Sequence, residues 1–299
     1  MNEYSELIRA IATLLWPILA FVSLIIFRGE IAKAIGRIKK GKFLGQEVEL
    51  SEDLIKLQLT ATEASEEVAS MPQLENEKAL EASEKEQPDF DDSAIKNIIK
   101  QASHSPKTAL ILLASEVEKE ARQTLASIGK FKTSRKLTLS QIIDELDSHY
   151  GLPKHVSSSL RLFWDTRNKI IHGGAAEDRN ILSAIDSGVT ILKTLQALPR
   201  ETNLIHNEGV TIYSDSICKN EIPNAKGIIL KTFSSSGAHV FYRIFPSTRT
   251  HFKKGIRVAW EWSFENTWND AWYKDPETNE IKLAWNSSAE FIGRNLDDI

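Results

Sequence analysis

Residues 105–129 read SPKTALILLASEVEKEARQTLASIG, and this stretch decides the fold class of the middle of the chain. Ser105 followed by Pro106 is typical of a helix N-terminus, because serine caps the first turn and proline fits its first position. Apolar side chains then recur every three or four residues up to Gly129, which predicts a helix with one buried face. These side chains are Leu110, Leu113, Val117, Ala121 and Leu125.

The same reasoning predicts four more helices around this one. A short helix follows Ser93, a third begins at Thr138 or Ser140 and ends at Gly151, a fourth begins at Pro153, and a fifth begins at Asp178. The fifth helix carries one apolar stripe, and the connections between all five are short. We therefore expect a compact all-helical bundle over residues 93–200.

The fourth predicted helix ends in RNKIIHGG, residues 167–174, which holds the residues best suited to chemistry. Cleavage of RNA by its own 2′-hydroxyl needs a group that moves a proton near neutral pH, which suits His172. It also needs a fixed cation for the charge that develops on the phosphate, which suits Arg167. Asn168 would orient the phosphate or the imidazole. This chemistry needs no metal or other cofactor, and we see no metal cluster among the seven histidines.

These residues resemble the R-N-x3-H signature of the HEPN superfamily. The preceding residues 137–166, LTLSQIIDELDSHYGLPKHVSSSLRLFWDT, resemble the approach to that motif in bacterial HEPN-type domains, including the DUF4145-like group. The resemblance covers residues 93–200, about a third of the chain. It implies a HEPN-like helical bundle and a metal-independent ribonuclease of bacterial defence or toxin systems, with its site shared across a two-fold homodimer. Other members of the superfamily only bind RNA or nucleotides, or only dimerise.

The spacing of the motif limits how it can act. Arg167 and His172 are five residues apart, so on a regular helix they point about 140° apart. Either the Gly-Gly end unwinds the last turn, or two copies of the chain contribute one residue each. Two alternatives are a binding or dimerisation role for the same residues and a purely structural role, in which His172 caps the last carbonyls of the helix.

A basic loop follows the second predicted helix. Residues 130–136 read KFKTSRK, and a run of this kind either contacts RNA phosphates or forms a solvated loop. With a lysine of the motif, the candidate RNA-binding residues are Lys130, Lys132, Arg135, Lys136 and Lys169.

The composition excludes several classes of protein. The chain has 299 residues and a net charge of −4, and its single cysteine, Cys218, forms neither an internal disulfide nor a cysteine-rich zinc site. This cysteine usage suits a reducing compartment.

The N-terminal residues predict a membrane anchor over residues 1–28. Residues 10–27 read AIATLLWPILAFVSLIIF, which carries no charge and spans roughly 27 Å as a helix. Residues 29–50 that follow are basic, which places them and the rest of the chain in the cytoplasm under the positive-inside rule. We therefore expect a single-pass protein of the inner (cell) membrane, held through residues 8–27. A signal peptide or a buried helix is the alternative.

Residues 51–92 change character. They contain 13 acidic residues but only Lys56, Lys78 and Lys85 as basic ones, and few large apolar side chains. Such a composition cannot bury enough surface to offset the entropy of ordering, so we expect an acidic flexible linker, either disordered or weakly helical.

Residues 201–299 change from a helical to an alternating pattern. Six strands are predicted, at 210–213, 228–233, 240–245, 256–264, 271–274 and 281–285, with a turn at 275–279. Trp260 and Trp262 would share one face, either as part of the core or as a surface on which nucleic-acid bases stack. The β-rich domain would bind a ligand or a protein partner.

The expected fold class is thus a multidomain chain with an N-terminal transmembrane helix, an all-α HEPN-like bundle and a small C-terminal β-rich domain. The expected function is a membrane-anchored, metal-independent endoribonuclease. The alternative is a non-catalytic, membrane-tethered protein that dimerises and binds a ligand or partner.

Overall fold

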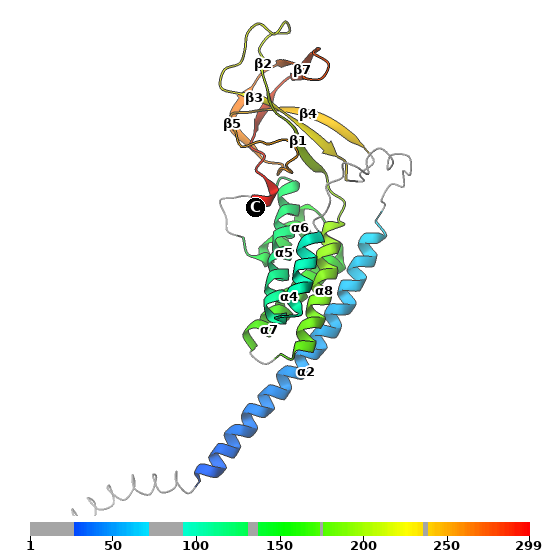
Figure 1. Cartoon of the computed structure of the whole chain (residues 1–299), viewed down its shortest axis with the longest axis vertical. Coiled ribbons are helices and arrows are strands. Elements are labelled where there is room, and N and C mark those ends of the chain that lie inside the picture. The colour runs from blue at the N-terminus through cyan, green and yellow to red at the C-terminus, as the bar shows by residue number, and fades with distance from the viewer. Residues whose placement is uncertain (1–26, 72–91, 131–136, 174–175, 236–238) are drawn as a thin grey trace, which may run out of the picture. The chain divides into compact units, whose positions relative to one another are not determined.

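The computed structural model describes residues 27–71, 92–130, 137–173, 176–235 and 239–299 (Figure 1). These residues form six α-helices and eight strands in small antiparallel sheets. Contacts divide the chain into two units, residues 1–52 and residues 53–299, which we describe separately.

All five helices predicted over residues 93–200 are confirmed. They are α4 (Asp92–Ala102), α5 (Pro106–Ser127), α6 (Leu139–His149), α7 (Lys154–Gly173) and α8 (Asp178–Gln196). Thr138 and Gln141 form a reciprocal capping box at the start of α6. Gly129 and Gly151 follow α5 and α6 with φ of +75° and +71°, a conformation that glycine adopts without strain. Local signals therefore fix where these helices begin and end.

Helix α8 packs closely against α5 and α7 around Gly188. A Cβ atom added to Gly188 of α8 would lie 2.5 Å from the ring of Phe163 and 2.7 Å from Leu113. Both neighbours are fully buried. The close approach of the three helices therefore requires glycine at this position.

Replacing Gly188 with alanine should destabilise the fold, because the new methyl group overlaps two side chains that have no room to move. We expect a loss of about 1–3 kcal/mol in the free energy of unfolding, measured by denaturant titration. Asp186→Ala, at an exposed position of the same helix, serves as the control and should change stability little. Equal stability of the Gly188→Ala variant and the unchanged chain would contradict this packing.

Helix α2 (Arg28–Ala69) corrects the prediction of a flexible or weakly helical tether over its first part, residues 51–69, which form a packed helix. Its residues from Asp53 onward belong to the second unit and bury one apolar stripe. Within this stretch Lys169 of α7 lies 2.6 Å from Asp53, and the backbone N–H of His155 donates to Glu67. The stripe has the three- and four-residue spacing of a packed helix, which the acidic composition conceals. Its members are Leu54, Leu57, Ala61, Ala64 and Val68. Residues 72–91 lie outside the described part of the chain.

The C-terminal strands form three sheets. Their bounds are β1 (Thr202–Val210), β2 (Ile212–Tyr213), β3 (Lys226–Phe233), β4 (Val240–Ser247), β5 (Trp262–Trp268), β6 (Ala271–Lys274), β7 (Ile281–Trp285) and β8 (Ser288–Phe291). The strand orders are β1-β3-β4, β2-β6-β7 and β5-β8. The sequence did not predict β1, whose register shifts at Ile205 and Asn207, or β8, which has only four residues.

Trp260 and Trp262 pack against the core of the β part. Trp260 and Trp262 pack edge to face, with ring centroids 5.1 Å apart, and both contact Phe245 and Phe291. They surround a buried cluster that includes Ile228 and Leu230 of β3. Of the two interpretations of these rings, the packed core is therefore the one that the structure supports.

Helices and strands pack against each other within the second unit. The side-chain amide of Gln123 on α5 donates to the carbonyl of Leu296 at 2.9 Å, and the backbone N–H of Trp260 donates to the carbonyl of Ala126 at 3.1 Å. Ala126, Ala259 and Leu296 form a shared apolar cluster. Arg200, which links α8 to β1, pairs with Glu120 and Thr124 of α5.

The expected fold class, in which the helical bundle and the small β-rich part are separate domains, is therefore wrong. Residues 53–299 form one compact unit of helices and small antiparallel sheets, because buried contacts join residues that lie far apart in the sequence. In the described part of the chain no helix has both the length and the apolar character to cross a bilayer. The predicted anchor over residues 1–28, apart from Phe27 and Arg28, lies outside the described residues.

Candidate nucleic-acid site at the end of α7

The predicted catalytic residues lie on the last two turns of α7. The helix continues through Gly173, so Arg167 and His172 share one regular helix. One of the two options from the sequence was that the last turn of this helix unwinds. The last turn instead stays helical to the end of the motif at His172. At about 100° per residue, the two side chains leave the helix about 140° apart. One copy of the chain therefore does not direct both side chains at one phosphate by helix geometry alone.

Arg167 is half-buried and held by two neighbours on the same helix. Its guanidinium carbon lies 5.1 Å from the centroid of the Trp164 ring, a cation–π arrangement. Its Nη1 donates to Oδ1 of Asn168 at 2.8 Å, while its Nε is buried and makes no hydrogen bond within the described residues. The guanidinium is thus fixed in place while some of its donors remain unused.

Among the described residues, Arg167 also lacks the acidic partner that most other described arginines have. Ten arginines have described side chains, and eight of them pair with a carboxylate. Within that set only Arg28, at the exposed start of α2, and Arg167 do not. The paired arginines are Arg122, Arg161, Arg179, Arg200, Arg243, Arg249, Arg257 and Arg294. A half-buried arginine without a carboxylate has the chemistry of an anion site.

His172 lies on the last turn of α7 and is exposed. Its ring makes no hydrogen bond or ion pair with any described residue, so the structure gives no contact for the capping role that the sequence left open. An exposed imidazole without a partner is accessible to a substrate or to a second copy of the chain.

The predicted RNA-binding residues do not gather around this motif. Lys169 lies 2.6 Å from Asp53 of α2, which offsets its charge. Lys130 is exposed just after α5, at the end that contacts the strands, whereas the C-terminal end of α7 lies at the opposite end of the helices (Figure 1). Lys132, Arg135 and Lys136 lie outside the described residues.

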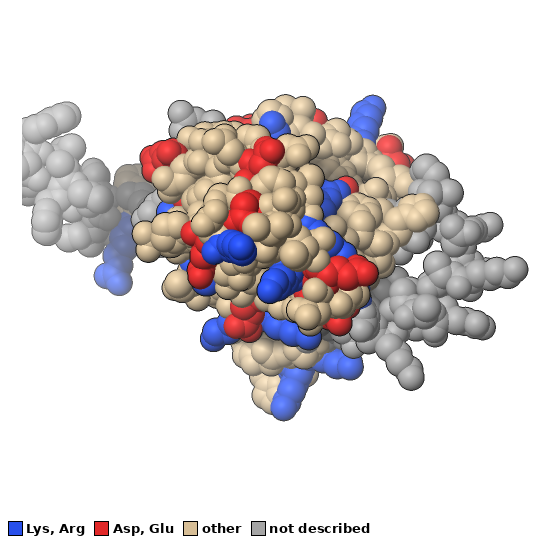
Figure 2. Space-filling view, turned by 90° about the horizontal axis from the view of Figure 1, so that it is seen from above, with Lys and Arg blue, Asp and Glu red and all other residues tan. Residues whose placement is uncertain are grey.

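The strand end of the molecule presents charges of both signs. In the face that Figure 2 shows, basic and acidic side chains are interspersed. An extended basic surface is the usual electrostatic footprint of a nucleic-acid-binding face. This face does not have that character, so the end of α7 remains the better candidate.

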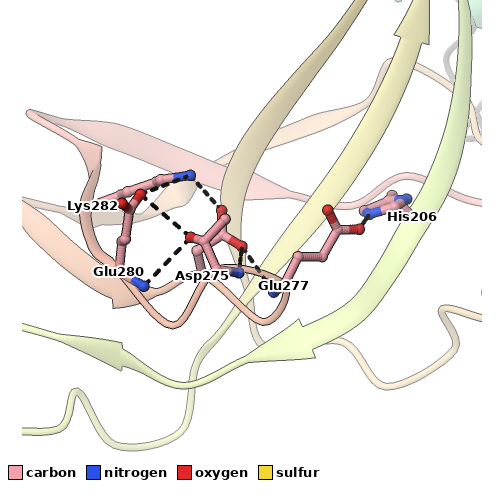
Figure 3. A network of polar contacts seen from close by, with 6 residues as sticks. His206, Asp275, Glu277, Glu280 and Lys282 are labelled. Carbon is pink, nitrogen blue, oxygen red and sulfur yellow. Dashed lines mark hydrogen bonds and ion pairs between the residues drawn. The ribbon is translucent and has the colours of Figure 1, made fainter.

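A second cluster of titratable side chains surrounds the β6–β7 turn (Figure 3). Nζ of Lys282 lies 2.6 Å from Oδ2 of Asp275. The backbone N–H groups of Glu277 and Thr278 donate to Oδ1 of the same aspartate. These hydrogen bonds, led by that from Lys282, lower the pKa of Asp275 to about 2. Glu277 in turn lies 3.1 Å from Nε2 of His206 on β1. The sequence predicted this turn but not its polar network, whose groups serve to hold the hairpin.

Asp275→Asn should lower the melting temperature by a few degrees at neutral pH, because the amide loses the charge that attracts Lys282. A carboxylate with a lowered pKa contributes stability above its unfolded pKa of about 4, and this stability is lost as the pH falls towards 2. The difference from the unchanged chain should therefore shrink over that interval in a series of thermal melts. Asp270→Asn, an exposed position nearby, is the control. A difference that does not depend on pH would contradict the electrostatic origin.

Comparison of the chain with protein-family models, with curated proteins and with solved structures finds no match.

Proposed function

We propose that the chain is a metal-independent endoribonuclease whose site forms where the C-terminal ends of two α7 helices meet. The observation that supports this most is the state of Arg167, which is half-buried, fixed by Trp164 and Asn168, and without a carboxylate partner among the described residues. Such a guanidinium is preorganised for the oxygens of a phosphodiester.

In this proposal Arg167 binds the scissile phosphate and stabilises the charge that develops during attack by the 2′-hydroxyl. His172 of the second copy either accepts the proton of that hydroxyl, with water protonating the leaving 5′-oxygen, or donates a proton to the leaving 5′-oxygen, with water accepting the proton of the hydroxyl. The phosphorus–oxygen bond to the 5′-oxygen breaks as the bond to the 2′-oxygen forms. The products are a 2′,3′-cyclic phosphate and a 5′-hydroxyl. Asn168 acts as a positioning residue, because it accepts a hydrogen bond from Arg167.

Two copies are needed because the two side chains lie about 140° apart on one regular helix. A homodimer that brings the ends of α7 together solves this geometry. Attachment of residues 8–27 to the inner membrane, as expected from the sequence, would raise the effective concentration of one copy near another.

RNA cleavage by the full-length chain in the presence of a chelator tests the proposal. We use the full chain because a fragment that begins at residue 93 would uncover the bundle face on which α2 packs. RNA fragments that end in cyclic phosphate would support the enzyme. RNA that binds but stays intact would favour the non-catalytic alternative. RNA that neither binds nor is cleaved would exclude both RNA cleavage and RNA binding as functions of the chain.

A further inference from the structure

A cavity of about 290 Å³ lies between the helices and the C-terminal residues of the second unit, away from the α7 motif. Its α5 wall presents Glu116, Lys119, Glu120 and Gln123, which recur at three- and four-residue steps and so share one face of the helix. The remaining walls come from α4, from α8 and from two residues of the C-terminal part. These are Ala94, Ile95, Leu192, Gln196, Arg257 and Asp297.

Two of the acidic side chains in this cavity have basic partners. Glu120 pairs with Arg200, and both are almost completely buried. Asp297 lies 3.4 Å from Arg257, which is a looser contact. These two pairs hold α5 to the start of β1 and the chain end to residue 257. Because the charges within each pair cancel, the net charge of the cavity depends on its other ionisable side chains.

Glu116 and Lys119 are the groups without partners. They are half-buried, lie one turn apart on α5 and make no ion pair or hydrogen bond with any described residue. Polar groups withdrawn from bulk water normally find partners, because desolvation costs free energy that a hydrogen bond recovers. The cavity therefore holds one acidic and one basic group, side by side, with no partner among the described residues.

We propose that this cavity binds a small zwitterion of the amino-acid class. Lys119 holds the carboxylate and Glu116 the ammonium group, while Gln196 and the Arg257–Asp297 pair are available to the polar part of the ligand. Charges of both signs balance in the cavity, which favours a molecule with both charges over a phosphate or another multiply charged anion. The volume suits one small molecule, near the lower end for ligand pockets.

Binding to this cavity does not depend on RNA cleavage, so its test uses neither RNA nor activity. The full-length chain is screened with the twenty L-amino acids, each by thermal melting and then by calorimetry. At least one should raise the melting temperature by a few degrees when it is present well above its dissociation constant. The N-acetylated and the carboxyl-amidated forms of that amino acid, which each lack one charge, should bind at least tenfold more weakly.

Glu116→Gln and Lys119→Gln should each weaken binding at least tenfold. Lys107→Gln, which removes an exposed lysine from the same helix, is the matched control and should bind like the unchanged chain. Failure of all twenty amino acids to bind would overturn the proposal, as would unchanged affinity in both cavity variants. Equally tight binding of the N-acetylated form would show a simple anion site and would overturn the zwitterion assignment.

Discussion

Replacement of His172 by alanine is expected to abolish RNA cleavage. In the proposed mechanism this imidazole transfers the proton that accompanies attack on the phosphate, a contribution of about 10²–10⁴-fold in rate. The side chain is exposed and makes no contact with described residues that the fold would lose. The thermal melt should therefore match that of the unchanged chain while the cleavage rate falls.

The measurement is the initial rate of RNA cleavage over a series of pH values. The chemical groups at the ends of the RNA products are identified in the same samples. Arg179→Ala is the matched control, because it removes an exposed side chain from the start of α8, close in sequence to the motif. It should retain full activity. Unchanged cleavage by His172→Ala, or an equal loss in the control, would show that the imidazole is not the proton-transfer group.

Replacement of Arg167 by alanine is expected to lower kcat by about 10²–10³-fold, because it removes preorganised donors from the charge that develops in the transition state. Arg167→Lys should recover only part of the rate. A lysine keeps the charge but not the planar fork that matches two phosphate oxygens, and it does not stack on Trp164 in the same way.

Arg167 is half-buried, so its variants need a check of stability before their rates are compared. Arg161→Ala serves as the control on the same helix, since Arg161 is a paired arginine on the surface. Its loss should leave kcat unchanged. Loss of RNA affinity without loss of kcat in Arg167→Lys would assign this residue to substrate binding rather than to transition-state stabilisation.

The helices were predictable because their signals are local. Ser105 and Pro106 open α5, the capping box of Thr138 and Gln141 opens α6, and glycines with positive φ follow both helices. Each of these signals depends on residues within one or two turns of each other. The predicted apolar stripe of α8 is likewise buried.

The packing of α2 and the joining of helices to strands were not predictable in this way. Ala61 and Ala64 contribute little to an apolar pattern, and the acidic residues around them dominate the composition. The contacts that merge the two expected domains join Gln123 to Leu296 and Ala126 to Trp260, which are distant in the sequence. A hydrophobic pattern indicates that one face of a helix is buried, but it does not indicate which element packs against that face.

The candidate site was predictable as a set of residue types but not as a set of contacts. The sequence names Arg167, Asn168 and His172, and the hydrogen bond between the first two joins neighbours in the chain. That Arg167 lacks a carboxylate partner in the described part of the chain depends on every element around α7, and the pairing of Lys169 with Asp53 spans more than a hundred residues. Local patterns carry no information about either.

Mixing two inactive variants tests whether Arg167 of one copy and His172 of another form one site. Full-length Arg167→Ala and His172→Ala chains are co-expressed, and dimers that contain one of each are purified by two different tags. Such a dimer holds one intact pair, with Arg167 from one copy and His172 from the other. We expect this mixed dimer to regain up to about half of the activity of the unchanged dimer, with products that end in cyclic phosphate. Mixed dimers that stay as inactive as either variant alone would contradict a site shared between two copies.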